Sequence, residues 1–205
     1  MSYLSAMPEP EISAPRSLFA TMKAHAVLLL SLLGIMWVVE ILDHLPFVQL
    51  DHFGIRPRSV AGLAGIVCTP FLHAGFTHLL ANSFPFVFLG GIVLLGGRAV
   101  FWRVTIFVTL AGGLGVWLFA GRFTNHLGAS GLIFGYLGFL LARGWFEKSL
   151  PWMLAAGVIL VAYGGLLAGV LPGSAGISWQ SHLFGFLAGL GAARFFLRRE
   201  PELLR

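Results

Sequence analysis

The chain has 205 residues, of which 58% are hydrophobic and only 10% are charged. A soluble domain carries about 25% charged residues, so this composition excludes a cytosolic globular protein and a disordered chain. The net charge of +5 reflects a shortage of acidic residues rather than a basic patch, which argues against nucleic acid as a partner. The single cysteine, Cys68, excludes a disulfide framework, a thiolate zinc site and an iron–sulfur cluster. The sequence therefore indicates a polytopic protein of the lipid bilayer.

Six membrane-spanning helices are predicted from the gaps between charged residues. A span needs about 20 apolar residues, and two gaps are long enough for two spans each, with 39 uncharged residues in 59–97 and 45 in 149–193. Turn signals around Pro70 and Pro172 divide them. The predicted helices cover residues 24–42, 76–97, 101–120, 128–143, 150–171 and 178–196. This pattern predicts an all-α fold, a polytopic six-helix bundle.

The segments outside the helices complete the predicted organisation. Residues 1–22 contain three prolines and no cleavable signal sequence is evident, so we expect a flexible N-terminal segment. Residues 23–197 are expected to form the only domain and 198–205 a short tail. Residues 43–72 mix charged residues with glycine and proline, and we expect a folded loop at the membrane surface. The tails and the loops on their side hold 10 of the 13 basic residues, which predicts that both termini are cytoplasmic.

Polar side chains gather at one depth of the predicted bundle. The second helix carries His78 and Asn82 in its first turns, the fourth carries Ser130 and the sixth carries His182. At a rise of about 1.5 Å per residue, all four lie within about 10 Å of the outer helix ends. Because polar groups are costly inside a bilayer, this placement predicts a single water-accessible pocket.

Glycines explain how two of these helices could come close together. Gly131 and Gly135 on the fourth helix and Gly185 and Gly189 on the sixth form two patterns of small residues four apart, which permit close helix packing. If these patterns face each other, the fourth and sixth helices place their serine and histidine within reach.

Serine beside histidine is the minimum for nucleophilic acyl transfer, in which the imidazole removes and later returns a proton. The spans offer no obvious third carboxylate, so a Ser130–His182 dyad is the economical hypothesis. His78, Asn82 and the backbone N–H of Ser130 could stabilise the oxyanion. A metal between His78 and His182 is a minor alternative, since no carboxylate or thiolate lies nearby; we expect neither metal nor other cofactor.

Each of these residues also has an ordinary structural interpretation. A lone serine in a membrane helix usually bonds to its own backbone, and a buried histidine or asparagine often bridges helices. We expect His73, before the second helix, to be an interfacial or capping residue rather than a ligand. His126 is expected to be an ordinary loop residue.

Three segments resemble motifs of the rhomboid intramembrane serine proteases. Residues 128–131 (Gly-Ala-Ser-Gly) resemble the Gly-x-Ser-Gly motif of that family. Residues 73–82 resemble its second-helix motif and residues 178–189 its sixth-helix motif, while the loop at 53–66 is similar to that of many bacterial members. The likeness covers residues 44–192, with the motifs in the expected order.

The resemblance implies roles for the polar residues. Ser130 would be the nucleophile, His182 the general base, and His78 with Asn82 the oxyanion donors. Phe134 occupies a position where many members have a tyrosine that packs against the base, and the first loop lacks the Trp-Arg pair of some members. The family implies cleavage of transmembrane protein substrates near the outer face of a bacterial inner membrane, without metal or nucleotide.

Two other functions compete with a protease. A catalytically silent relative could bind membrane helices, although a pure binder does not need the complete catalytic set. A small transporter or channel could use the polar cluster as a solute site, but the sequence has no internal repeat and no acidic residue deep within the spans.

Overall fold

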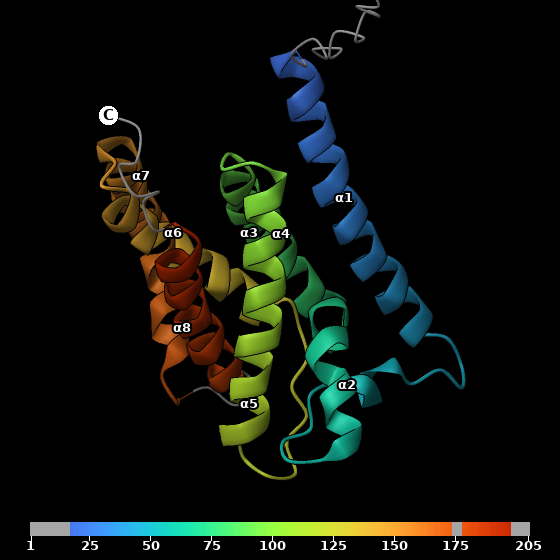
Figure 1. The fold of residues 1–205 in the computed structure, drawn as a ribbon. Helices are drawn as coiled ribbons and strands as arrows, with labels where there is room; N and C mark the ends of the chain where they lie inside the picture. Colours follow the sequence, from blue (N-terminus) through green and yellow to red (C-terminus); the bar gives the residue numbers. More distant parts are fainter. Residues whose placement is uncertain (1–16, 174–177, 198–205) are drawn as a thin grey trace, which may run out of the picture.

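The computed structural model describes residues 17–173 and 178–197. Within these ranges the chain is helical, and its β pairing is a single isolated bridge. In chain order the elements are α1 (Leu18–Asp43), η1 (Leu50–Phe53), α2 (Val60–Cys68), η2 (Thr69–Phe71), α3 (Phe76–Leu94), α4 (Arg98–Phe107), η3 (Val108–Gly112), α5 (Gly113–Phe119), α6 (Ser130–Glu147), α7 (Leu150–Tyr163), η4 (Gly164–Val170) and α8 (Trp179–Phe196) (Figure 1). The predicted C-terminal tail, 198–205, lies outside the described residues, as does the N-terminal segment up to residue 16.

The predicted six spans are confirmed as an all-α membrane bundle. They are α1, α3, the continuous α4–η3–α5 segment (Arg98–Phe119), α6, the α7–η4 segment (Leu150–Val170) and α8. Four of them are long and apolar enough to cross a bilayer by length and composition alone, namely α1, α3 and the two composite segments. The other two, α6 and α8, carry Ser130 and His182.

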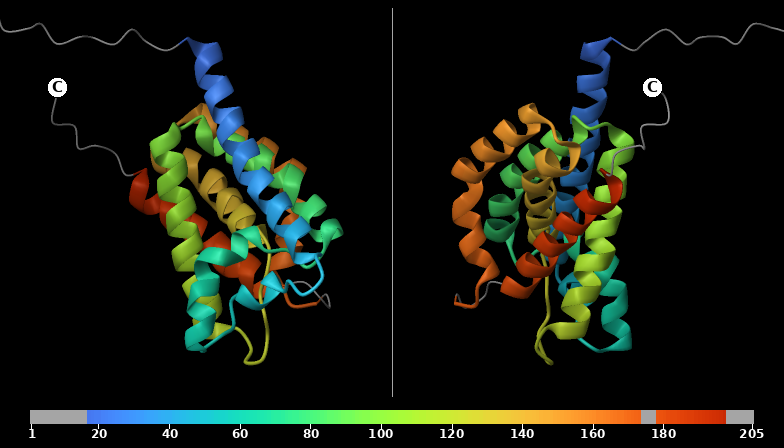
Figure 2. Two further views of the ribbon diagram at one scale, coloured as in Figure 1. Left: turned by 90° about the vertical axis from the view of Figure 1, so that its right-hand side faces the viewer. Right: turned by 60° about the vertical axis from the view of Figure 1, so that its left-hand side comes forward.

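α6 is the central helix, and α3, the α4–η3–α5 segment, α7 and α8 pack around it (Figure 2). Its residues from Leu132 to Leu140 are all buried, so every face of the helix is covered by protein. An apolar helix buried on all sides needs no polar face toward water. The nucleophile candidate Ser130 is therefore the first residue of the most enclosed helix in the bundle.

The predicted glycine seam joins α6 to α8. A Cβ atom added to Gly185 would overlap the carbonyl oxygen of Gly131, and one added to Gly189 would overlap that of Gly135. The two helix backbones are thus in direct contact, as small residues four apart permit. This contact fixes the beginning of α6 against the beginning of α8.

The start of α1 differs from the prediction. The helix begins at Leu18 rather than 24, so residues 18–22 of the segment expected to be flexible are helical. The side chain of Ser17 accepts a hydrogen bond from the amide of Ala20 at 3.2 Å and caps the first turn. The apolar residues between Ser17 and Lys23 continue the helix on the N-terminal side of Lys23, whereas the prediction starts the span after that charge.

The bounds of α6 also differ from the prediction. The helix runs from Ser130 to Glu147, whereas the charge pattern predicts 128–143, with Arg143 at the edge of the span. Arg143 is instead 6% exposed and donates from Nε to the carboxylate of Glu147 at 2.9 Å. A charged residue that is paired and buried does not mark the membrane surface, so the helix continues for another turn.

The loop of residues 44–72 folds into η1, α2 and η2. With nine residues, α2 is about 14 Å long, too short to cross about 30 Å of hydrocarbon. Arg58 anchors the loop by donating to the carbonyl oxygens of Leu118 and Ala120 at 2.6 and 2.7 Å. This contact caps the C-terminal end of α5.

The same loop holds the segment that precedes Ser130. Ile55 pairs with His126 in the isolated antiparallel bridge, with both N–H···O distances at 3.0 Å. The buried Thr69 hydroxyl donates to the carbonyl of His126 at 3.0 Å, and the Thr69 carbonyl accepts the amide of Gly128 at 3.2 Å. The loop therefore fixes the path of the chain into the first turn of α6.

Candidate active site

The four polar residues singled out in the sequence line one pocket of about 640 Å³. His78 and Asn82 come from α3, Ser130 from the start of α6 and His182 from the first turns of α8. Further lining residues are Thr124, Asn125 and His126 of the preceding loop, Phe134 of α6, and Ser178 and Gln180 at the start of α8. The structure thus brings all of the predicted site residues to the same end of the bundle.

The chain approaches Ser130 through a constrained glycine. Gly128 has φ +110°, a backbone conformation that L side chains rarely adopt. A Cβ at this position would lie 2.9 Å from Nε2 of His78 and 3.7 Å from Oγ of Ser130. The missing side chain therefore lets the Nε2 edge of His78 approach the turn that carries the serine hydroxyl.

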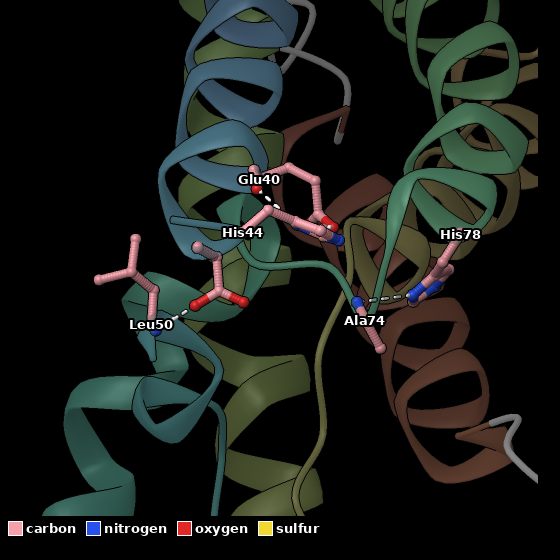
Figure 3. A network of polar contacts seen from close by, with 6 residues as sticks. Glu40, His44, Leu50, Ala74 and His78 are labelled. Atoms are coloured by element: carbon pink, nitrogen blue, oxygen red, sulfur yellow. Dashed lines mark hydrogen bonds and ion pairs between the residues drawn. The ribbon is translucent and has the colours of Figure 1, made fainter. Parts of the chain in front are cut away.

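The hydrogen bonds of His78 indicate which ring nitrogen carries its proton. The amide of Ala74, just before α3, donates to Nδ1 of His78 at 3.4 Å (Figure 3). Because Nδ1 accepts, a neutral ring carries its hydrogen on Nε2. The nitrogen that faces Gly128 and Ser130 is therefore a hydrogen-bond donor.

Asn82 lies one turn after His78 and is 6% exposed. Its Nδ2 donates to the backbone carbonyl of His78 at 2.8 Å, which occupies one of its two N–H groups. The second N–H is left for a group in the pocket that Asn82 lines.

The start of α3 is in turn held by the C-terminal end of α1. The ring of His44 packs on Phe76, the first residue of α3, with ring centroids 4.4 Å apart. Nδ1 of His44 lies 2.9 Å from the backbone oxygen of Glu40, whose side chain is 1% exposed (Figure 3). This contact fixes the helix end from which His78 projects.

His182 has one ring face and one ring nitrogen fixed by neighbours. Its ring stacks on Phe134 with centroids 4.1 Å apart and an angle of 6° between the planes. Its Nδ1 lies 2.9 Å from the carbonyl oxygen of Gly169 in η4. A carbonyl only accepts, so Nδ1 is protonated and Nε2 of the neutral ring keeps a free lone pair. This is the tautomer that a general base acting through Nε2 requires.

The role of Gly169 was missed in the sequence. The prediction considered only side chains for orienting the histidine, and the partner is a backbone carbonyl in a glycine-rich apolar run. A glycine is also required there, because an added Cβ would lie 3.0 Å from Nδ1 of His182 and 3.2 Å from Cζ of Phe134. A local pattern does not reveal this contact, which depends on how η4 returns to α8.

His73 makes contacts with both the N-cap residue of α6 and α3 that go beyond its expected interfacial or capping role. The residue is 1% exposed, and its Nε2 accepts a hydrogen bond from the amide of Ala129 at 3.3 Å. Its ring also packs edge-on against His78 with centroids 5.2 Å apart. Burial lowers the pKa of His73 to about 4, helped by the nearby His78, so the ring is neutral and able to accept. His73 thus positions the residue before Ser130 and the ring of His78 together.

His126 connects the serine segment to α8. Its Nδ1 lies 2.5 Å from Oγ of Ser178, the residue that caps α8, and its Nε2 lies 2.8 Å from Oγ1 of Thr124. Burial lowers the pKa of His126 to about 4. A residue that the sequence indicated only as part of a loop therefore ties the segment before Ser130 to the helix that carries His182.

Within the described part of the chain, no hydrogen bond joins the hydroxyl of Ser130 to His182. Catalytic hydrogen bonds are often long in a free enzyme and shorten only when substrate binds. The two residues share one pocket, and Phe134, one turn after Ser130, contacts the histidine ring.

Comparison with known proteins agrees with this fold. Residues 60–199 match the Rhomboid domain. An uncharacterized protein of Mycobacterium tuberculosis is 41% identical over 183 residues, which is 85% of this chain and 75% of the relative, and one of Mycobacterium leprae is 40% identical over 184 residues, or 86% and 72%. A Bacillus subtilis protein named as a candidate rhomboid protease is 34% identical over 125 residues, or 59% and 61%. The chain belongs to the rhomboid family.

Proposed function

We propose that this protein is an intramembrane serine endopeptidase that cleaves transmembrane proteins near the outer face of a bacterial inner membrane, with both of its termini in the cytoplasm. One observation carries the proposal. The ring of His182 is held between Phe134 and the Gly169 carbonyl, with Nε2 unprotonated, in the pocket that also contains Ser130.

The proposed reaction uses Ser130 as the nucleophile. Nε2 of His182 removes the hydroxyl proton while Oγ attacks the carbonyl carbon of the substrate peptide bond. The same proton passes from Nε2 to the leaving amine, and an acyl-enzyme remains on Ser130. His182 then removes a proton from water, which attacks the ester, and returning that proton to Oγ releases the new carboxyl terminus.

The tetrahedral intermediates carry a negative oxygen that needs donors already in place. Nε2–H of His78 faces the turn at Gly128, and the second amide N–H of Asn82 belongs to the same pocket. The backbone N–H of Ser130 is a third donor, because the first amides of a helix have no partner within it. Loss of one such donor lowers turnover by about 10²–10³-fold.

The decisive experiment is active-site labelling with a fluorophosphonate in detergent, combined with cleavage of a model transmembrane substrate. Ser130→Ala should abolish both signals, and His182→Ala should lower cleavage by about 10⁴-fold or more. Ser83→Ala is the matched control, because Ser83 lies on α3 but does not line the pocket: its hydroxyl donates to the carbonyl of Leu79 at 2.8 Å and accepts from Nε1 of Trp37 at 3.3 Å. It should label and cleave like the original protein.

The outcomes separate the proposed enzyme from a silent relative. A folded protein that neither labels nor cleaves, yet retains membrane helices in a pull-down regardless of Ser130→Ala, would be a binding protein. Labelling that persists in Ser130→Ala would assign the nucleophile to another residue.

A further inference from the structure

The end of the bundle opposite Ser130 has a hollow lined by two basic residues from different helices. Its volume is about 530 Å³, and it lies between the first turns of α1 and the start of α4. Lys23 of α1 and Arg98 of α4 supply the charge, and the described residues that line it include no acid. Neither side chain makes an ion pair with another described residue. This hollow therefore has an uncompensated charge of +2.

A second hollow lies further along the same two helices and also borders α2, η2, α3, η3 and α6. It has a volume of about 260 Å³ and a lining that is apolar except for two threonine side chains. Leu32 lies one turn beyond Leu28 of the first hollow on α1, and Trp102 lies one turn beyond Arg98 on α4. Residues four apart share a helix face, so the two hollows follow one seam.

The seam is open because of how α1 packs. This helix rests on α3 and on the loop elements η1 and η2 rather than along α4, and Figure 1 shows it splayed away from the rest of the bundle. From Lys23 to Met36, which lines the second hollow, α1 extends about 20 Å. One leaflet contributes about 15 Å of hydrocarbon, so the seam has the length of one lipid.

We propose that this seam, which we call the α1/α4 groove, binds an anionic phospholipid. The phosphate lies between Lys23 and Arg98, and an acyl chain follows Leu28 and Leu32 toward the second hollow. Basic residues between helices at a membrane surface select acidic headgroups. Arg98 is also the first residue of α4, where the helix dipole favours an anion. An apolar tail in the deeper hollow distinguishes a lipid from a free anion.

Native mass spectrometry of the full chain released from detergent tests the groove with three probes. These are dioleoyl phosphatidylglycerol, dioleoyl phosphatidylcholine and glycerol 3-phosphate. We expect the first to be retained, the second to be retained at least tenfold less and the third not to be retained. Equal retention of the two lipids overturns the proposal. Binding of glycerol 3-phosphate as tight as that of phosphatidylglycerol also overturns it, because the groove would then bind anions without using the acyl chain.

A pair of double variants locates the lipid. Lys23→Gln with Arg98→Gln should weaken phosphatidylglycerol binding by about 30-fold, since each basic residue near an anionic surface contributes about fivefold. The control is Arg103→Gln with Lys148→Gln, which removes the same charge from exposed residues that line neither hollow. Equal loss in both variants would show diffuse attraction and refute a defined site.

Weaker lipid binding by the Lys23→Gln, Arg98→Gln variant is not expected to come from loss of folding. Lys23 and Arg98 are exposed, so their substitution removes no core packing. Size-exclusion chromatography checks both double variants, and the comparison of lipids on the unaltered protein stands independently of them.

Discussion

Nδ1 of His182 lies 2.9 Å from the carbonyl oxygen of Gly169, so the group that orients the proposed base belongs to the backbone. In a serine protease with a carboxylate in this position, a side-chain substitution can delete the acceptor. Here every residue at position 169 retains a carbonyl. A substitution can therefore disturb this contact only by moving η4 relative to α8. Gly169 fits closely against His182 and Phe134, so a larger residue at position 169 would cause such a movement.

Gly169→Ala should impair catalysis by displacing the base. Its Cβ would lie 3.0 Å from Nδ1 of His182 and 3.2 Å from Phe134, so the stacked pair must shift. Misplacement of a catalytic group by about 1 Å lowers the rate by about 10²-fold. We expect a loss of 10–100-fold in kcat for a model substrate, with a smaller change in KM, and a displaced pH profile of kcat.

The control for this substitution is Gly165→Ala. Gly165 lies in the same element, η4, and an added Cβ there has no atom within 4 Å. This variant should cleave at the original rate and with the original pH profile. Equal impairment in both variants would show that the general flexibility of η4, rather than the contact with His182, limits the reaction.

His73→Ala should destabilise the segment that leads into Ser130. The substitution leaves the buried amide of Ala129 without its acceptor, which costs about 1–3 kcal/mol of unfolding free energy. Labelling of Ser130 by a fluorophosphonate should slow because the turn before it is no longer fixed. His73→Gln provides an acceptor at nearly the place of Nε2 and should recover most of the stability and labelling rate. A glutamine variant as impaired as the alanine variant would contradict the assigned role.

Stability should fall in acid because of the two buried histidines outside the spans. Burial lowers the pKa of His73 and of His126 from 6.5 to about 4. Between these pH values the unfolded chain binds more protons than the folded chain. The unfolding free energy therefore has its full value above pH 6.5 and decreases as the pH falls toward 4. Thermal unfolding in detergent at pH 7.5, 6 and 5 should show this decline.

A double variant, His73→Gln with His126→Gln, tests the source of that decline. It should be less stable at pH 7.5, because it loses two fitted rings, yet its stability should change less between pH 7.5 and 5. A slope as steep as that of the original protein would assign the acid sensitivity to other groups.

The sequence predicted what depends on periodicity and composition. The six helices follow from charge gaps, and the contact of Gly131 with Gly185 follows from the spacing of small residues. The placement of Ser130 and His182 in one pocket follows in turn from that contact. These features are local in each helix, and membrane thickness supplies the remaining constraint.

What the sequence did not predict depends on contacts between distant segments. The acceptor at Gly169 has no side chain, and His73 was assigned a capping role because its partner lies 56 residues away at Ala129. The charge pattern ends a span at Arg143, because pairing with Glu147 and burial among aromatic rings are properties of the folded chain. Residues whose role is to position others are the ones least visible in a single sequence.

Gly185→Ala should disrupt the site from within the helix seam. Alanine is about 1 kcal/mol better than glycine in a helix, so intrinsic propensity favours the substitution. Its Cβ would nevertheless overlap the carbonyl oxygen of Gly131, which forces α8 away from α6 and carries His182 away from Ser130. We expect a lower unfolding temperature together with loss of fluorophosphonate labelling.

Gly191→Ala, on the same helix with its nearest contact at 3.5 Å, should keep its labelling and unfold at the original temperature or above. If both variants label normally, the seam between α6 and α8 is not what holds the serine and the histidine in register.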